Sequence, residues 1–153
     1  MIANKLWQFP SPSTSMHSGY VNLIHSGEHA LLLFDYYDSV KDDVFNSGIL
    51  IDGVQALRTT CEFFIMAGAA NGDYVWQAYD KLVEYQDSDW LEYYRSLNGK
   101  QEDFRGIKHY GIILDSVGFF EFLARSFRGL DTKKGGMDEF SYPDIRDIVR
   151  SRA

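Results

Sequence analysis

Hydrophobic residues follow the alternating pattern of β-strands most clearly between residues 107 and 127. Two runs rich in β-branched and aromatic residues, 110–114 and 119–126, flank Asp115-Ser-Val-Gly118, a sequence that favours a turn. Side chains alternate between the two faces of a strand, and here both faces carry apolar groups. This pattern is typical of a central strand pair that is covered on both sides, so we expect 107–127 to form the central hairpin of the fold.

The first third of the chain repeats this pattern. Apolar runs at 19–24 and 30–37 flank the turn-forming segment 25–29 and predict another hairpin. Residues 38–48 are polar and rich in turn formers, which predicts an exposed loop. Further strands are expected at 49–51 and, as one or two strands, within 54–64.

One mid-chain helix is predicted over 88–97. Asp87 or Ser88 can cap its N-terminus, acidic residues occupy the first turn, and Asn98-Gly99 can end it. A stripe at helical spacing is expected to pack on the central hairpin, and it consists of Trp90, Leu91, Tyr94 and Leu97. Between 74 and 85 helical and strand patterns compete, and the sequence does not decide between them.

The C-terminal region predicts a second helix over 142–151, because Ser141 can cap it and an early proline suits its first turn. Residues 129–140 are expected to form a flexible loop before this helix, and residues 1–18 a proline-containing arm pinned to the domain. The length of 153 residues suits a single domain, 1–153. The predicted fold class is α+β, built on a mainly antiparallel β-sheet.

The net charge of −7 is unevenly distributed along the chain. Residues 28–62 hold seven acidic residues against two basic ones, and 73–103 hold eight against three, whereas 125–152 hold seven basic residues against five acidic ones. Binding to nucleic acid requires lysine and arginine to neutralise phosphates, so direct binding to nucleic acid is not expected. An acidic protein with ten tyrosines is better suited to contact a basic protein.

The single cysteine, Cys61, excludes an internal disulfide and fits a reducing compartment. The N-terminal residues lack the apolar run of a signal peptide, and no stretch approaches the roughly 18 apolar residues of a membrane-spanning helix. We therefore expect a cytoplasmic protein that does not associate with membranes.

The segment His25-Ser-Gly-Glu-His29 matches the letters of the H-x-x-E-H zinc pattern, which works only on a helix. A turn is predicted here, so no metal site is expected. The acidic segment 35–43 lacks the ligand spacing and central glycine of a calcium loop. The sequence also lacks a phosphate-binding loop and a nucleophile motif, so we expect no catalytic or cofactor-binding residues and no cofactor.

Two residues with reactive side chains have structural interpretations. Cys61 lies in a predicted strand and is expected to be a packed thiol. His109 opens the central hairpin and is expected to be a hydrogen-bonded residue at a strand end rather than a general base. An enzyme with a dispersed site stays open as an alternative, and its available groups are His109, Glu121 and the acidic residues of 35–43.

Two segments resemble small cytoplasmic proteins of bacterial polymorphic-toxin loci. Asp87-Ser-Asp-Trp90 matches a D-S-x-W helix start, and 108–127 matches the hairpin that follows it in those proteins, with the pattern H-(Y/F)-x-hydrophobic, then D, then G-x-(F/Y)-E-x-(I/V/L)-A-x-S. Residues 49–63 are similar to their middle strand segment, and together the matches touch roughly residues 20 to 127.

The resemblance implies an immunity protein of a contact-dependent inhibition or Rhs-type system. Such a protein is a non-catalytic partner that binds and neutralises a cognate toxin domain, and many of these toxins are basic and attack nucleic acids. The alternative is a phage-type inhibitor or nucleic-acid mimic that occupies a basic cleft of a bacterial defence enzyme. This alternative predicts a denser array of carboxylates than −7 over 153 residues provides.

The contact surface is expected at 35–43, where carboxylates can steer a basic partner and tyrosine rings can anchor it. Acidic residues within 87–92 are expected to make secondary contacts. The predicted partner-binding residues are Tyr36, Tyr37, Asp38, Asp42, Asp43, Asp87, Asp89 and Glu92.

Overall fold

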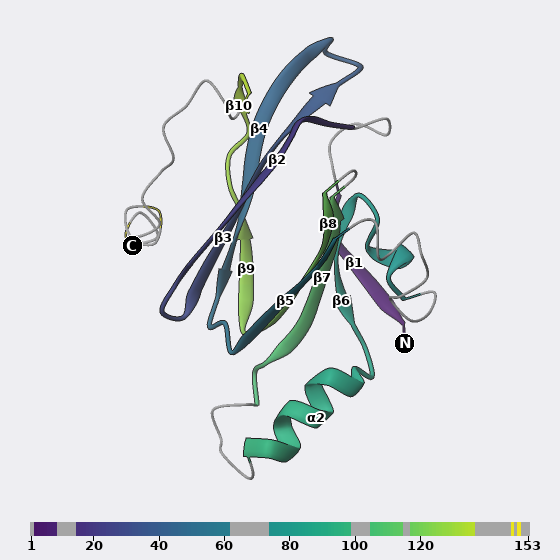
Figure 1. The fold of residues 1–153 in the computed structure, drawn as a ribbon, viewed down its shortest axis with the longest axis vertical. Coiled ribbons are helices and arrows are strands. Elements are labelled where there is room, and N and C mark those ends of the chain that lie inside the picture. The colour runs from purple at the N-terminus through teal and green to yellow at the C-terminus, as the bar shows by residue number, and fades with distance from the viewer. Residues whose placement is uncertain are drawn as a thin grey trace.

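The computed structural model describes residues 2–8, 15–61, 74–98, 105–114, 117–136, 148 and 150. These residues form two antiparallel β-sheets and two helices (Figure 1). The strand order of sheet A is β1 (Ala3–Gln8), β6 (Lys81–Tyr85), β7 (Lys108–Leu114), β8 (Gly118–Ala124) and β5 (Ala56–Cys61). The order of sheet B is β10 (Lys133–Lys134), β4 (Asp43–Asp52), β3 (His29–Asp38) and β2 (Ser15–Ser26), and β9 (Ser126–Gly129) also pairs with β4. The helices are the 3-10 helix η1 (Trp76–Ala78) and the α-helix α2 (Asp89–Asn98).

The predicted central hairpin is confirmed, because β7 and β8 pair with each other in the middle of sheet A. Its second strand is shorter than predicted, since β8 ends at Ala124 and the chain then enters β9 in sheet B. Where the sequence predicts one sheet, the structure therefore has two. The two crossings between the sheets lie side by side: the Arg125 N–H donates to the Asp52 carbonyl (2.9 Å), and the Gln55 N–H donates to the Leu123 carbonyl (2.8 Å).

The main hydrophobic core lies between the two sheets. Alternate residues of β3 and β4 face alternate residues of β7 and β8, so the period of two in the sequence builds both walls. Smaller apolar clusters on the outer side of sheet A involve η1 and α2, which gives the hairpin cover on both faces as predicted. Fully buried members of the main core include Leu32, Phe34, Ile49, Ile51, Ile112 and Phe122.

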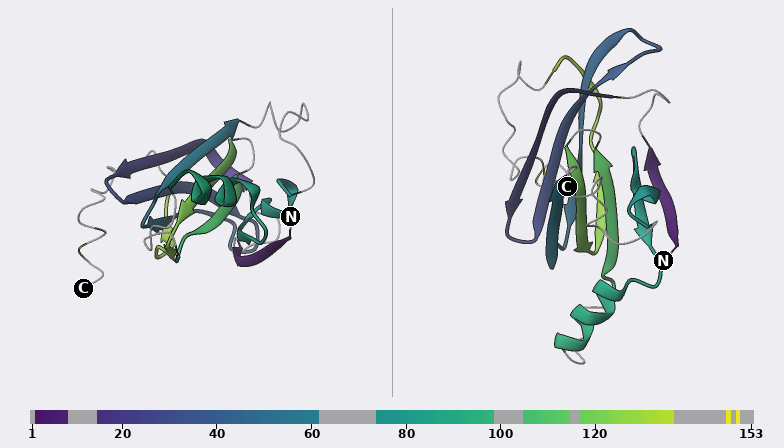
Figure 2. Two further views of the ribbon diagram at one scale, coloured as in Figure 1. Left: turned by 90° about the horizontal axis from the view of Figure 1, so that it is seen from below. Right: turned by 45° about the vertical axis from the view of Figure 1, so that its right-hand side comes forward.

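The predicted mid-chain helix is confirmed as α2, which lies at the end of sheet A where β7 begins (Figures 1 and 2). Leu91 packs on Ile107 and Leu123, and the rings of Trp90 and Tyr94 lie beside this cluster. The expectation that Leu97 packs inward is wrong, because its side chain is 62% exposed. In 74–85 both competing patterns are realised, η1 as a helical turn and β6 as a strand.

The expected loop over 38–48 is wrong, because β3 runs to Asp38 and β4 begins at Asp43, which leaves only 39–42 as a turn. The polar side chains of β4 that suggested a loop have long-range partners instead. The Asn46 amide donates to the carbonyls of Lys133 and Gly135, and the Ser47 hydroxyl donates to the carbonyl of Leu130. These tertiary contacts override the local turn preference.

Other segments are more regular than predicted. The hairpin expected at 19–37 is confirmed as β2 and β3, but both strands are longer. Residues 3–8 of the expected arm form β1, and residues 133–134 of the expected flexible loop form β10. The helix expected over 142–151 lies outside the described residues apart from Ile148 and Arg150, so a second α-helix is not confirmed.

Candidate functional site

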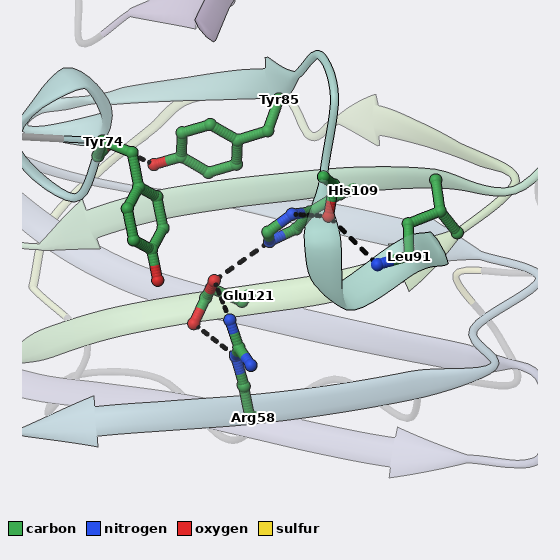
Figure 3. A network of polar contacts seen from close by, with 7 residues as sticks. Arg58, Tyr74, Tyr85, Leu91, His109 and Glu121 are labelled. Carbon is green, nitrogen blue, oxygen red and sulfur yellow. Dashed lines mark hydrogen bonds and ion pairs between the residues drawn. The ribbon is translucent and has the colours of Figure 1, made fainter. Parts of the chain in front are cut away.

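A network of four polar side chains lies on the outer side of sheet A, next to α2 (Figure 3). Its members are Ser88, His109, Glu121 and Arg58. His109 in β7 and Glu121 in β8 are diagonal neighbours, because Gly111 is the residue directly opposite Glu121. The distance from His109 Nε2 to Glu121 Oε1 is 3.0 Å. His109 is 0% exposed and Glu121 is 2% exposed, so this contact lies in the interior of the protein.

Ser88 links this pair to the helix. Its Oγ accepts a hydrogen bond from the Leu91 N–H (3.1 Å), which makes Ser88 the predicted N-cap of α2. The same Oγ lies 2.7 Å from His109 Nδ1. With Glu121 as a carboxylate, His109 Nε2–H donates to it and Nδ1 accepts the Ser88 hydroxyl proton, an arrangement in which each of these atoms has a partner.

Arg58 closes the network on the other side. It lies in the edge strand β5 directly opposite Glu121. Its Nε donates to Glu121 Oε2 (2.7 Å) and its Nη2 to Glu121 Oε1 (2.9 Å), a bidentate ion pair. The guanidinium also lies over the Trp90 ring of α2, 4.0 Å from its centroid. The Arg58 side chain is 42% exposed, so it is the part of the network that contacts solvent.

The electrostatics of the network favour the charged ion pair. Burial alone would raise the pKa of Glu121, but the hydrogen bonds from His109 and Arg58 and the charge of Arg58 lower the pKa below its ordinary value. Burial alone would lower the pKa of Arg58, but Glu121 raises it. Burial, followed by the charge of Glu121, raises the pKa of Tyr74 and of Tyr85. The Tyr85 hydroxyl donates to the Tyr74 carbonyl (2.7 Å).

A serine, a histidine and a carboxylate in contact have the composition of a hydrolase triad. Here the order on the imidazole is reversed, with the serine at Nδ1 and the carboxylate at Nε2. Ser88 is only 3% exposed, and its oxygen is engaged by the Leu91 N–H. A nucleophile must reach a substrate atom, so this geometry is suited to holding α2 on the sheet rather than to attacking a substrate.

Parts of this network follow from the sequence. Ser88 is a candidate cap there, and His109 and Glu121 are groups of the dispersed-site alternative. His109 is hydrogen-bonded near a strand end, as expected. The sequence does not reveal the contribution of Arg58, because its pairing with Glu121 depends on the register between β5 and β8, which are far apart in the sequence.

The predicted contact surface at 35–43 is not a loop but the tip of the β3–β4 hairpin, and two of its predicted contacts are buried. Tyr36 is 1% exposed and stacks near Phe45. Asp38 is buried and accepts hydrogen bonds from the N–H groups of Val40 and Lys41, so its carboxylate shapes the turn.

The remaining predicted contacts at the tip have partners within the chain. The half-buried Tyr37 donates its hydroxyl proton to the exposed Asp42 carboxylate. The Asp43 carboxylate lies 2.7 Å from Lys134 Nζ. The hydrogen bond from Lys134 is the main reason why the pKa of Asp43 is lowered. A partner that used these groups would have to compete with the internal contacts.

The residues predicted to make secondary contacts lie at α2 rather than at the β3–β4 tip. Asp87, Asp89 and Glu92 are all exposed at the N-terminal end of α2. Glu92 forms an ion pair with Arg95 one turn further on, with 2.6 Å between Oε1 and Nη1. The network and this acidic surface are therefore on opposite sides of the same helix.

The other sequence candidates are separate from the network. His25 is exposed, and His29 Nδ1 lies 2.9 Å from Asp52 Oδ1 on the neighbouring strand. Cys61 is the last residue of the edge strand β5 and is exposed, so the expectation that its thiol is buried is wrong. Across the described ranges, no group of three or more His, Cys, Asp or Glu residues is placed to hold a metal ion.

Comparison of the chain with protein-family models, curated proteins and solved structures gives no match. In the described part of the chain, none of the helices has the length and apolar character needed to cross a membrane.

Proposed function

We propose that this chain is a cytoplasmic immunity protein that binds and neutralises a cognate, basic toxin domain, with a nuclease as the favoured activity of that toxin. It acts without catalysis and without a cofactor. The resemblance of 87–90 and 108–127 to proteins of polymorphic-toxin loci is the sequence basis for this function.

The main structural support for the proposal is the buried network of Ser88, His109, Glu121 and Arg58. These four residues hydrogen-bond to one another and to the start of α2, and three of them are at most 3% exposed. Such a network holds a helix in a fixed orientation. The fixed helix presents carboxylates to solvent, which supports a binding function in preference to a catalytic one.

Charge supports the same function. The chain carries −7 overall, and complementary charge accelerates encounter and selects partners. A nuclease domain must neutralise phosphates with lysine and arginine, so an acidic inhibitor matches the chemistry of such a toxin.

The test begins with the genes on either side of the one that encodes this chain. A toxin domain encoded there is expressed alone and together with the chain in a sensitive bacterium. We expect growth arrest by the toxin alone, rescue by co-expression, and a one-to-one complex by titration calorimetry. Failure of the chain to bind any neighbouring gene product, or binding without rescue, would contradict the proposal.

A matched control separates binding from catalysis. Ser88→Ala removes the hydroxyl that contacts His109 in the network. If the chain were a hydrolase that destroyed the toxin or its product, this variant would lose rescue even when it is folded and bound. We expect rescue by the folded variant to fall only as far as its affinity for the toxin domain falls, because Ser88 also holds α2 in place.

A further inference from the structure

The exposed side of α2 forms a continuous stripe. Its residues follow the spacing i, i+3, i+4, i+7 and i+8, which places them on one side of a helix, and all are exposed. With Asp87 in the turn before the helix, they form a surface that we call the α2 face. It consists of Asp87, Asp89, Glu92, Tyr93, Ser96 and Leu97.

The α2 face carries two large apolar side chains that the fold leaves uncovered. Tyr93 and Leu97 are each 62% exposed, and their spacing of four residues makes them neighbours on the helix surface. Single exposed apolar residues are common. An adjacent pair that includes a tyrosine is a suitable anchor, because a tyrosine ring offers large contact area at a small loss of rotamer freedom.

Carboxylates border these anchors on the N-terminal side. Asp87, Asp89 and Glu92 supply three negative charges, and Arg95 is the only basic residue in the α2 sequence. Arg95 is already engaged by Glu92 and by the Ile107 carbonyl, 3.4 Å from its Nη2. The charge that the α2 face offers to a partner is therefore negative, which complements a cationic surface.

The helix is also held firmly from behind. The Ser88 cap, the packing of Leu91 on Ile107 and Leu123, and the hydrogen bond from the Tyr94 hydroxyl to the Gln55 carbonyl (2.9 Å) fix three points along it. A surface that is ordered before binding loses less conformational entropy on association. α2 lies at one end of the molecule, clear of sheet B (Figures 1 and 2).

Resting on the proposed function, we infer that the α2 face, and not the β3–β4 tip, is the surface through which the chain binds its toxin domain. The geometry points to a partner with a shallow apolar groove bordered by lysine and arginine. Tyr93 and Leu97 lie in the groove, as helical anchors do in helix-in-groove complexes. Asp87 and Asp89 face the basic border, with Glu92 and its ion-pair partner Arg95 beside them, whereas the carboxylates of Asp42 and Asp43 at the tip are engaged within the chain.

The experiment measures binding of the toxin domain from the neighbouring gene to the unmodified chain and to three variants of it. The first variant, Tyr93→Ser with Leu97→Ser, removes the anchors, and the second, Asp87→Asn with Asp89→Asn and Glu92→Gln, removes the charges. Asp87 has a positive φ of 53°, which asparagine also tolerates. The matched control, Val40→Ser with Asp42→Asn, changes one exposed apolar and one acidic residue at the tip.

We expect the anchor variant to raise the Kd by about tenfold or more, as for anchor residues of an interface. The charge variant is expected to slow association and to reduce its dependence on salt. The tip control should bind as the unmodified chain does. Circular dichroism and thermal unfolding are expected to show that all the variants fold, because every changed residue is exposed.

The outcomes separate this inference from the proposed function. If the unmodified chain binds and rescues, but both α2 variants bind equally well, the α2 face is not the interface and the immunity function stands. If the unmodified chain binds no neighbouring toxin domain, the proposed function fails and the inference fails with it. If the chain dimerises in solution and the anchor variant is a monomer, the α2 face is a self-association surface, which also overturns the inference.

Discussion

His109 Nε2 lies 3.0 Å from Glu121 Oε1 in the outer layer of sheet A, and both side chains are buried. Through its other nitrogen His109 contacts Ser88, the cap of α2, and through both of its oxygens Glu121 accepts from Arg58 on the edge strand β5. One line of polar contacts therefore runs from the helix start across two strands to the sheet edge. Changes in this line are expected to affect the stability of the sheet and the position of the helix together.

Glu121→Gln removes the negative charge that pairs with Arg58 and accepts from His109. Removing one partner of a fully buried ion pair costs about 3–5 kcal/mol, and the 42% exposure of Arg58 reduces this, so we expect a loss of about 2 kcal/mol in the free energy of unfolding. Urea denaturation measures the change. The control is Glu84→Gln, which breaks the more exposed contact with Lys108 and should cost less than about 1 kcal/mol. Equal effects of the two variants would contradict a special role for Glu121.

The acid dependence of stability follows from the lowered pKa of Glu121. Its pKa in the folded protein lies below the ordinary value of 4.5, so ionised Glu121 stabilises the folded state. This contribution is complete above the unfolded pKa and is lost as the pH falls through the folded pKa. We expect the free energy of unfolding to fall less steeply in Glu121→Gln than in the unmodified chain as the pH falls below the ordinary value of 4.5. If the free energy of unfolding falls equally steeply with pH in both proteins, Glu121 is not the cause of the acid dependence.

Ser88→Ala removes both the helix cap and the hydrogen bond to His109. Loss of a cap costs about 1 kcal/mol, and a buried acceptor left without a partner adds about 1 kcal/mol or more. We expect a loss of about 2 kcal/mol in urea denaturation. In the control, Ser96→Ala, the exposed hydroxyl donates to the carbonyl of Tyr93 within the helix, and the change should stay within about 0.5 kcal/mol. If Ser88→Ala leaves the free energy of unfolding unchanged, Ser88 does not hold α2 in place.

Gly118 begins β8 with a positive φ of 154°, and a Cβ at this position would lie 2.5 Å from the Thr60 carbonyl oxygen of β5. Gly118→Ala therefore forces two paired strands apart, and we expect a loss of about 3 kcal/mol in the free energy of unfolding. A Cβ at Gly106 would meet no heavy atom within 4 Å, so Gly106→Ala is expected to change stability by less than about 1 kcal/mol. Similar unfolding midpoints for the two variants would contradict the close approach of β5 and β8.

The sequence predicts the elements whose signals are local. The hairpin of β7 and β8 follows from alternation around a turn, and α2 follows from Ser88 as a cap and an acidic first turn. The split into two sheets depends on Ser126–Gly129 pairing with β4, which lies more than seventy residues earlier in the chain. No local sequence pattern predicts the pairing of two strands so far apart in the chain.

The candidate site is likewise predicted where its contacts are local and missed where they are non-local. Alternation places His109 and Glu121 on the outer face of the hairpin, and hairpin register makes them diagonal neighbours. The ion pair with Arg58 requires the non-local pairing of β5 with β8. The acidic tip is predicted as a loop because aspartate, asparagine and serine favour turns, whereas contacts of Asn46 with the 133–135 backbone hold this segment as a strand.

Backbone amide hydrogen exchange can locate the interface with the toxin domain without any substitution in the chain. Exchange is measured for the chain alone and for the chain with a saturating amount of the toxin domain from the neighbouring gene. We expect the amides of α2, residues 89–98, to gain the most protection in the complex, and the turn at 39–42 to exchange as it does in the free chain. Protection that is confined to 39–42, with α2 unchanged, would contradict binding through the α2 face.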